Sequence, residues 1–259
     1  MSASNSYAPD RVEMFALRGI PLVRPGDDLA ELIGNACASN DLPLEDNDVI
    51  VVAQKIVSKS EGRVVRLSEV TPSAEAIERA RETNKDPALV QLILDESNEV
   101  IRQHHGIIIV EHRLGYVMAN AGIDQSNADS GQVILLPEDS DATAAHLADT
   151  LHATCGARVG VIVSDSIGRA WRNGTVGQTL GVAGIQPLLD LRDTMDLFDR
   201  RMQVTEVAIA DEIAAAASAL MGQGDEAKPV VVVRGFRAMP DENASVRALL
   251  RSRELDMFR

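Results

Sequence analysis

Two aspartates follow apolar runs, and their carboxylates are the side chains in this chain best placed to do chemistry. Residues 115–123 run into Asp124, and residues 160–164 run into Asp165. Continuous branched apolar residues, as in VGVIVSD, suit a strand that is covered on both faces. We therefore expect each carboxylate to emerge at a strand end, the second beside a glycine-containing loop at 166–174. Two such carboxylates could bind a hard divalent cation.

Each aspartate also has a plainer interpretation. Asp124 lies in NAGIDQSN (residues 120–127), a segment in which aspartate and asparagine commonly bond local backbone groups in a turn. Asp165 with Ser166 could equally be only a cap. Taken together, two carboxylates and a neighbouring hydroxyl favour the metal interpretation, because magnesium or manganese is typically held by one or two carboxylates plus substrate phosphates.

Four basic residues are candidates for binding an anionic group. Lys55 and Lys59 follow the apolar segment DVIVVA (residues 48–53), and lysine can act as a point charge on phosphate. Arg169 and Arg172 flank Trp171 and could hold a carboxylate or phosphate by paired hydrogen bonds. The alternatives remain open: the lysines could be ordinary solvated charges, and an arginine could stack on Trp171 for packing alone.

The common nucleotide motifs are missing from the sequence. There is no GxxxxGK[ST] loop and no GxGxxG after a strand, so neither a P-loop nor a Rossmann fold is supported. Gly177, Gly181 and Gly184 are spaced four and three apart, which we interpret as close backbone packing. His104 and His105 have no third ligand nearby, so a histidine metal site is not expected.

The charge and composition of the chain exclude some classes of binding partner. The chain has 259 residues and a net charge of −14, which argues against sequence-independent nucleic-acid binding and against an anionic membrane surface. No apolar stretch is long enough to span a membrane, and the polar start lacks the regions of a signal peptide. Cys37 and Cys155 lack metal-ligand spacing. These features fit a protein of the reducing cytoplasm.

Hydrophobic patterns and turn residues predict a mixed α/β (α+β) fold, because strands and helices mix without strict alternation. We expect a flexible tail at 1–10 and a single domain over 11–259, with two lobes as an open possibility. Strands are expected at 12–17, 48–53, 107–110, 115–121, 133–136 and 229–234. Helices are expected at 29–39, after 71–73, and at 87–97, 139–154 and 205–221, with a charged helix at the C-terminus.

Several motifs in one order resemble a known family. The segments are GIPLVRPGDDLAEL, DVIVVAQKIVSKSEGR, NAGIDQSN, VGVIVSDSIGRAWRNG, VTEVAIADEIAAAASALMG and PVVVVRG. They resemble the coenzyme F-420-0: L-glutamate ligase family over residues 12–237. The resemblance implies a family-specific ligase fold with two intertwined lobes, and enzymes that join L-glutamate to a deazaflavin coenzyme precursor using GTP.

The resemblance also implies roles for individual residues. GTP, the co-substrate, would be held by Ile20, Pro21, Leu22, Val23, Gln54, Lys55, Lys59, Asn127 and a segment from Met221 through Gln223 to about Lys228. Two divalent ions, Mg²⁺ or Mn²⁺, would be bound by Asp124, Asp165, Ser166 and Gln223, and K⁺ is a further candidate ion. Asp124 and Asp165 would be catalytic, and Arg169 or Arg172 would position an anionic substrate group.

The implied reaction is amide formation through an acyl phosphate. GTP would phosphorylate the phospholactyl carboxylate of coenzyme F-420-0, and the amine of L-glutamate would displace phosphate; further γ-linked glutamates could follow. The resemblance implies a homodimer. Two alternatives stay open, namely a ligase of the same mechanism for a different carboxylic acid and a non-catalytic GTP-binding protein. Asp199 stands where the family pattern usually has glycine, so we expect a positive φ there.

Overall fold

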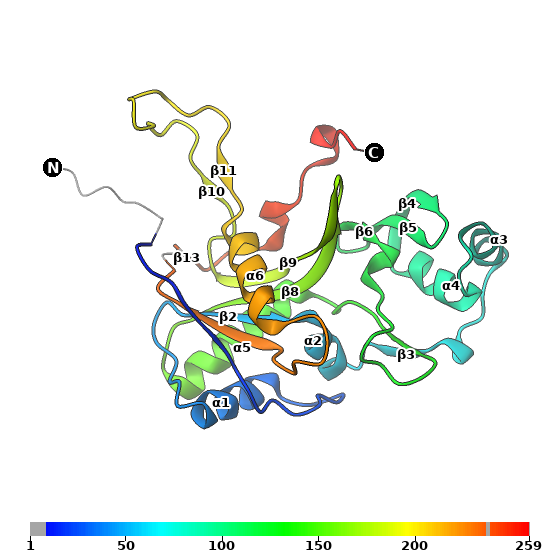
Figure 1. The fold of residues 1–259 in the computed structure, drawn as a ribbon, viewed down its shortest axis with the longest axis horizontal. Coiled ribbons are helices and arrows are strands. Elements are labelled where there is room, and N and C mark those ends of the chain that lie inside the picture. Colours follow the sequence, from blue (N-terminus) through cyan, green and yellow to red (C-terminus); the bar gives the residue numbers. More distant parts are fainter. Residues whose placement is uncertain (1–8, 237–238, 259) are drawn as a thin grey trace.

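A six-stranded sheet forms the centre of the computed structural model, which describes residues 9–236 and 239–258 (Figure 1). The expected flexible tail lies outside the described residues except for residues 9 and 10. The strand order is β1 (Glu13–Ala16), β12 (Val230–Arg234), β2 (Val49–Ala53), β8 (Gly160–Arg169), β9 (Arg172–Ile185) and β13 (Pro240–Asp241). Of these neighbours only β2 and β8 run parallel. Together with its helices, this sheet confirms the mixed α/β class.

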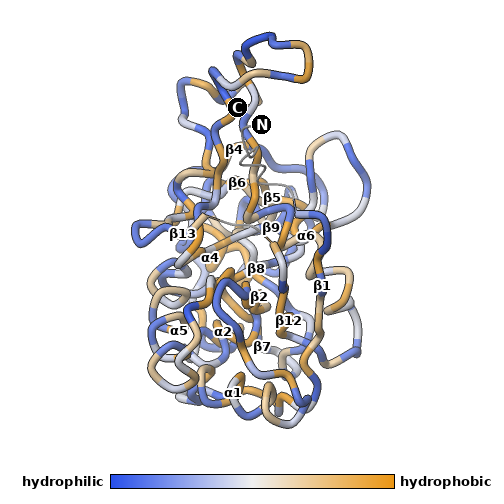
Figure 2. Tube along the Cα trace, turned by 90° about the vertical axis from the view of Figure 1, so that its left-hand side faces the viewer, coloured by the Kyte–Doolittle hydropathy of each residue, from blue (hydrophilic) through white to orange (hydrophobic). Residues whose placement is uncertain are grey.

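Both faces of the sheet are covered by helices, which explains why its strands are continuously apolar. Ile50 and Val52 pack with α1 (Leu29–Ser39) and α5 (Ser140–Cys155). Val49 and Val51 point the other way and pack with α6 (Ile209–Met221). Because side chains alternate along a strand, a strand buried on both faces must be apolar at every position. Figure 2 shows this hydrophobic centre as orange tube along β2 and β12.

Residues 64–134 carry a separate hydrophobic cluster that includes Ile93, Ile108 and Val133. Its helices are α3 (Ala74–Thr83) and α4 (Pro87–Asp95). Its strands are β3 (Val64–Arg66) paired with β7 (Gln132–Ile134), and the three-stranded sheet β4 (Ser97–His104), β5 (Ile107–His112) and β6 (Val117–Ala119). The division into two lobes, which this cluster fits, stays a prediction.

A buried carboxylate anchors this segment where the chain enters and leaves it. Glu96 accepts hydrogen bonds from Arg63 at 2.7 Å and Arg113 at 3.1 Å, and Arg63 Nε also donates to the Leu136 carbonyl at 2.9 Å. Burial alone would raise the pKa of the Glu96 carboxyl, but hydrogen bonds from His112, Arg63 and Arg113 lower it to about 2. The charged network therefore persists at neutral pH and ties residues 63 and 136 to the end of α4.

The register of β8 against β9 shifts by one residue, which leaves Leu180 as an extra residue in β9. Such a bulge breaks the ladder locally, and carboxylates from two helices accept the neighbouring amides. The Thr179 amide donates to Asp211 of α6 and the Val182 amide to Asp141 of α5, each at 2.9 Å. The bulge is thus held from both faces of the sheet.

The three spaced glycines confirm the packing interpretation. A Cβ at Gly177 would overlap the carbonyl oxygen of Ala214 in α6, and one at Gly181 would overlap the carbonyl of Ser140 in α5. Residues four apart in a regular strand share a face, but the bulge between these two turns them toward opposite helices. Gly184 has φ +76°, a conformation that glycine adopts at little cost.

Three sequence expectations were wrong. β8 does not end at Ser164 but continues through Asp165 to Arg169, and residues 166–174 form a hairpin with β9 instead of a loop, because antiparallel pairing with β9 satisfies this backbone. Residues 115–121 do not form one strand, since β6 ends at Ala119 and a left-handed turn follows. The C-terminal charged helix is replaced by two short 3₁₀ turns, Val246–Leu249 and Arg253–Leu255.

Other expectations hold with small changes of boundary. The helix expected from residue 205 begins at Ile209, because β11 (Glu206–Val207) pairs with β10 (Leu189–Asp190). The helices expected at 29–39 and after 71–73 are present, with the side chains of Asp28 and Ser73 capping α1 and α3. None of the helices in the described part of the chain is long and apolar enough to cross a membrane.

We predict that Gly181→Ala lowers the free energy of unfolding by about 2 kcal/mol, because its new Cβ would force β9 away from the start of α5. Thermal denaturation should show a Tm lower by roughly 4–8 °C. Gly168→Ala is the matched control: it lies in the same hairpin with no atom within 4 Å of the added Cβ, and its Tm should stay within about 2 °C of the parent. Equal Tm values for the two variants would contradict the packing argument.

Candidate functional site

Four segments of the chain meet at one edge of the central sheet. β2 and β8 are parallel, with Ala53 paired to Ser164, so both leave the core in the same direction. β12 is antiparallel to β2, so the loop at 222–229 enters at this edge, where the Ala53 amide donates to the Pro229 carbonyl at 2.8 Å. The loop after β1 supplies residues 20–23. Strand direction alone therefore brings these distant segments together.

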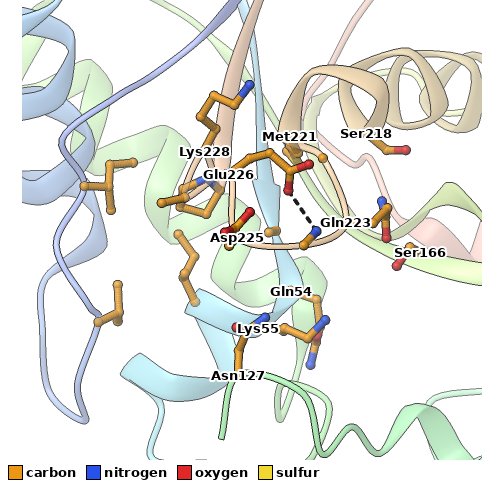
Figure 3. Close-up of a pocket in the computed structure, with 18 of the residues that line it drawn as sticks. Gln54, Lys55, Asn127, Ser166, Ser218, Met221, Gln223, Asp225, Glu226 and Lys228 are labelled. Carbon is orange, nitrogen blue, oxygen red and sulfur yellow. Dashed lines mark hydrogen bonds between the residues drawn. The ribbon is translucent and has the colours of Figure 1, made fainter.

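A cavity of about 370 Å³ lies between these segments. Figure 3 shows Gln54, Lys55 and Asn127 below it and the 221–228 loop above. The lining residues are Ile20, Pro21, Leu22, Val23, Ala53, Gln54, Lys55, Ile56, Lys59, Asn127, Ser164, Asp165, Ser166, Ser218, Met221, Gly222, Gln223, Gly224, Asp225, Glu226, Ala227, Lys228 and Pro229.

Two carboxylates and one ammonium group form the charged centre of the site. Lys55 Nζ lies 2.8 Å from Asp124 Oδ2, and the Ser126 amide donates to Asp124 Oδ1 at 2.6 Å. Asp165 Oδ1 accepts the Ser166 amide at 2.8 Å. Alternation along β8 puts Asp165 on the face of Val161 and Val163, where α2 (Gln54–Ser60) begins.

The two carboxyls have opposite pKa shifts. Burial raises the pKa of Asp165, the charge of Asp124 raises it further, and Lys55 and the Ser166 amide only partly oppose this. Burial would also raise the pKa of Asp124, but the hydrogen bond from Lys55 and those from Ser126 outweigh it and lower the pKa. Lys55 acts on both carboxyls, but its hydrogen bond goes to Asp124. Asp165 is thus the group whose negative charge most lacks compensation.

A strained turn positions Asp124. Asn120, Ala121 and Gly122 all have positive φ, at 53°, 52° and 67°, and the left-handed conformation costs a non-glycine residue about 1–2 kcal/mol. The turn directs the chain so that Asp124 pairs with Ile134, exchanging backbone hydrogen bonds of 3.0 and 2.8 Å. Strain of this kind persists where the surrounding structure enforces it, and it clusters at functional sites.

Helix α2 fastens the 124–127 loop to the sheet edge. Lys59 Nζ donates to the Asn127 carbonyl at 2.7 Å. Gln54 is buried, and its amide donates to Ser58 at 2.9 Å and to the Leu135 carbonyl at 3.3 Å. The loop and α2 therefore form one wall of the cavity.

The opposite wall is a loop that closes on its own carboxylate. Glu226 Oε2 accepts the Gly224 amide at 2.8 Å, drawn as the dashed line in Figure 3. This bond and one from its own amide lower the pKa of Glu226. Gly222 ends α6 with φ +78°, a conformation that glycine adopts at little cost, and a Cβ there would displace the Glu226 carboxylate.

Comparison with known proteins places the chain in a family. A family model described as F420-0:Gamma-glutamyl ligase matches residues 19–235. The chain belongs to this family. It is 47% identical over 249 residues to the coenzyme F420:L-glutamate ligase of Methanothermobacter thermautotrophicus, covering 96% of this chain and 99% of that protein. It is 43% identical to the protein of that name from Methanocaldococcus jannaschii and 42% identical to that from Archaeoglobus fulgidus, each match covering 96% of this chain and 97% of the relative.

The structure brings most of the residues named from the sequence to one place. All ten single residues expected to hold the nucleotide line the cavity: Ile20, Pro21, Leu22, Val23, Gln54, Lys55, Lys59, Asn127, Met221 and Gln223. Asp165 and Ser166 line the cavity too. Asp124 is not among the lining residues, but it forms an ion pair with Lys55, which is. Their roles in binding stay predictions.

Two expected residues lie elsewhere. Arg169 and Arg172 pair at the outer end of the β8–β9 hairpin and are not among the residues that line the cavity. The sequence suggested a loop that could fold back over the site, but antiparallel pairing holds both arginines away from it.

Sequence reasoning did not single out Ser218, Asp225 and Glu226. Ser218 lies in α6 three residues before Met221, and residues three apart share a helix face, so this spacing could have revealed it. Asp225 and Glu226 fall inside the named 221–228 segment, but nothing in the sequence shows that one of them faces its own loop.

The donor set fits a hard divalent cation. Asp124 and Asp165 offer carboxylate oxygens, Ser166 a hydroxyl and Gln223 an amide oxygen. The Lys55 ammonium already acts as the cation beside the two carboxylates. Among the described residues, no cluster of three or more acidic, histidine or cysteine side chains is placed to hold a metal ion, so a divalent ion here would depend on water and substrate phosphates for its remaining ligands.

We predict that Asp165→Asn separates stability from function. A carboxyl whose pKa is raised in the folded state costs stability as soon as pH exceeds its pKa in the unfolded chain, so at pH 7 the neutral amide should raise the Tm of the ligand-free protein. Below about pH 3, where Asp165 is mostly protonated in folded and unfolded chains alike, the Tm gain should vanish.

If Asp165 binds the metal directly, turnover in the presence of metal should fall by more than about 100-fold in Asp165→Asn. Loss of a residue that only supports a metal ligand already costs about 10–100-fold. Asp149→Asn is the control on the exposed side of α5 and should change neither quantity. A lower Tm for Asp165→Asn at pH 7 would contradict the assignment of an uncompensated charge.

Proposed function

We propose that the protein is a GTP-dependent ligase that joins L-glutamate to coenzyme F-420-0 through an acyl phosphate, releasing GDP and phosphate. The family and its named relatives support the ligase chemistry. The observation that carries the rest is the cavity lined by Lys55, Lys59, Asp165 and the 222–229 loop, with Asp124 paired to Lys55. Such a cavity combines oxygen ligands for cations with ammonium groups for phosphates.

The first step transfers a phosphoryl group. The phospholactyl carboxylate attacks the γ-phosphorus of GTP, a new P–O bond forms to the acyl oxygen, and the bond to GDP breaks. Lys59 donates to the neutral Asn127 carbonyl, so its charge is available to the phosphates, whereas Lys55 is shared with Asp124. Two bound Mg²⁺ or Mn²⁺ ions, held by Asp124, Asp165, Ser166 and Gln223, would neutralise the triphosphate.

The second step forms the amide. The amine of L-glutamate attacks the acyl carbon, a C–N bond forms, phosphate leaves with the acyl oxygen, and the amine proton passes to solvent. Asp165 lies in β8 and lines the nucleotide cavity, and β8 continues from there into the hairpin. The reacting carboxylate of the acceptor would therefore enter the cavity from the side of the hairpin. Positioning supplies most of the catalysis in such transfers.

The identity of the acceptor is the part of the proposal most open to direct test. Asp199 adopts φ 56°, as the family's glycine suggested, but it does not line the cavity, so this departure gives no support to a different acceptor. A cytoplasmic location is proposed on the two free cysteines, Cys37 and Cys155, since reducing compartments keep thiols unpaired.

We predict that the protein, supplied with coenzyme F-420-0, L-glutamate, GTP and Mn²⁺, forms a product heavier by one or more glutamate residues, with one GDP released per amide. Mass spectrometry of the product and a phosphate assay measure this. GDP release only with another carboxylic acid would favour the alternative ligase. Tight GTP binding by calorimetry with no turnover on any acid would favour the non-catalytic alternative.

We also propose a homodimer, supported by the arm formed by residues 189–207. Figure 1 shows this arm, in yellow, extending away from the body, and Figure 2 shows hydrophobic residues at its tip. Leu197 is 98% exposed and Phe198 79%. Large apolar side chains exposed together mark interaction surfaces, and a second copy of the chain is the occupant we assign.

We predict that Leu197→Asp with Phe198→Asp shifts the protein from dimer to monomer in light scattering coupled to size exclusion, because charges would have to be buried in the contact. Val12→Asp, at an exposed apolar position of the body, is the control and should leave the mass unchanged. A monomeric parent protein would contradict the dimer.

A further inference from the structure

An exposed aromatic pair lies outside the cavity, at the outer end of the β8–β9 hairpin. Trp171 is 86% exposed and Phe258 is 56% exposed. Their ring centroids are 6.4 Å apart and the rings are tilted by 55°. Figure 1 shows the hairpin end and the C-terminal segment as neighbours. Two large rings from distant parts of the sequence therefore share a surface open to solvent.

Trp171 lies in the two-residue turn that joins β8 to β9 between the paired residues Arg169 and Arg172. Its φ is 65°, and short hairpin turns commonly require a positive φ. The indole is almost fully exposed. The turn therefore presents a flat ring to the solvent at the end of the hairpin.

Three arginines surround the pair. The guanidinium carbon of Arg251 lies 5.9 Å from the centre of the Phe258 ring, and Arg169 faces Arg172 across the hairpin. Within residues 9–236 and 239–258, none of the three forms an ion pair, and Arg169 Nε is buried without a hydrogen-bond partner. In a chain of net charge −14, guanidinium groups left without carboxylates suit an anionic ligand.

The hairpin sets the distance between this surface and the cavity. Asp165 and Arg169 lie four residues apart on β8, which spans about 13 Å at roughly 3.3 Å per residue. A ligand that touches both ends must be elongated, with a flat ring at one end and its reactive group at the other. The proposed acceptor has this form, because its deazaflavin ring and its phospholactyl carboxylate are at opposite ends.

We propose that Trp171 and Phe258 stack on the deazaflavin ring of the acceptor, while Arg169, Arg172 and Arg251 attract its negative charge. This inference rests on the proposed function and names the subsite that function requires. It also gives Arg169 and Arg172 a role in positioning substrate at a distance from the reacting atoms.

The test measures steady-state kinetics of Trp171→Ala, Trp171→Phe and Phe258→Ala with each substrate varied in turn. Trp171→Ala and Phe258→Ala should each raise KM for coenzyme F-420-0 about tenfold, the loss expected for one stacking partner. Trp171→Phe should restore most of it, and KM for GTP should stay within about twofold. Ile107→Ala, at an exposed position of the 64–134 segment, is the matched control and should change none of these values.

Three results would overturn the inference while leaving the ligase function intact. The first is an unchanged KM for the acceptor in Trp171→Ala and Phe258→Ala, and the second is a parallel rise in their KM for GTP. The third is conversion of these variants to monomers in light scattering, which would make the aromatic pair a subunit contact.

If the parent protein does not ligate, the proposed function fails, and a binding assay with 5-deazariboflavin decides the inference separately. The fluorescence anisotropy of 5-deazariboflavin should rise as the parent protein is added, and the Kd for Trp171→Ala should be about tenfold higher. Equal Kd values for the two proteins would overturn the inference.

Discussion

The carboxylate of Asp165, set into the middle of a strand at the edge of a buried sheet, is the constraint on which the site depends. A charge taken out of water must be compensated, or its pKa rises. Here the nearest cation, Lys55, is also bound to Asp124, so two carboxylates share one ammonium group. That deficit of positive charge would favour the added cations of the proposed reaction, which in turn would let an acidic protein accept a polyphosphate.

Two features of the fold position the charged groups of the site. The parallel pair β2 and β8 sends Lys55 and Asp165 to the same sheet edge. The bulge at Leu180 is held by carboxylates from both covering helices, and the Tyr116 hydroxyl donates to its carbonyl. Because Tyr116 belongs to the 64–134 segment that also carries Asp124, one contact links the geometry of β8 to that of the second carboxylate.

In the proposed reaction, an elongated acceptor would connect the cavity with the hairpin. A ligase that activates a carboxylate with a nucleotide must hold the nucleotide, the acid and the amine at one point, and entropy favours a protein that fixes all three beforehand. The cavity is lined by backbone-rich loops that suit a nucleotide, and the rigid β8–β9 hairpin offers a second point of attachment on the far side of Asp165. A strand serves as a spacer more accurately than a loop, since its pairing fixes the rise per residue.

The sequence by itself determined the composition of the site and most of the elements that carry it. Apolar runs predicted β2, β8 and β12, and turn residues predicted where α1 and α3 begin. Spaced glycines predicted the close contacts of β9 with its helices. What only the tertiary structure decided is where the side chains meet: that Asp165 lies within a strand, that Arg169 and Arg172 stand away from the cavity, and that Trp171 and Phe258 come together. Local patterns record which backbone conformation a residue prefers and which face it buries, whereas strand pairing, bulges and carboxylate contacts depend on residues from separate parts of the chain, such as Lys55 with Asp124 and Trp171 with Phe258.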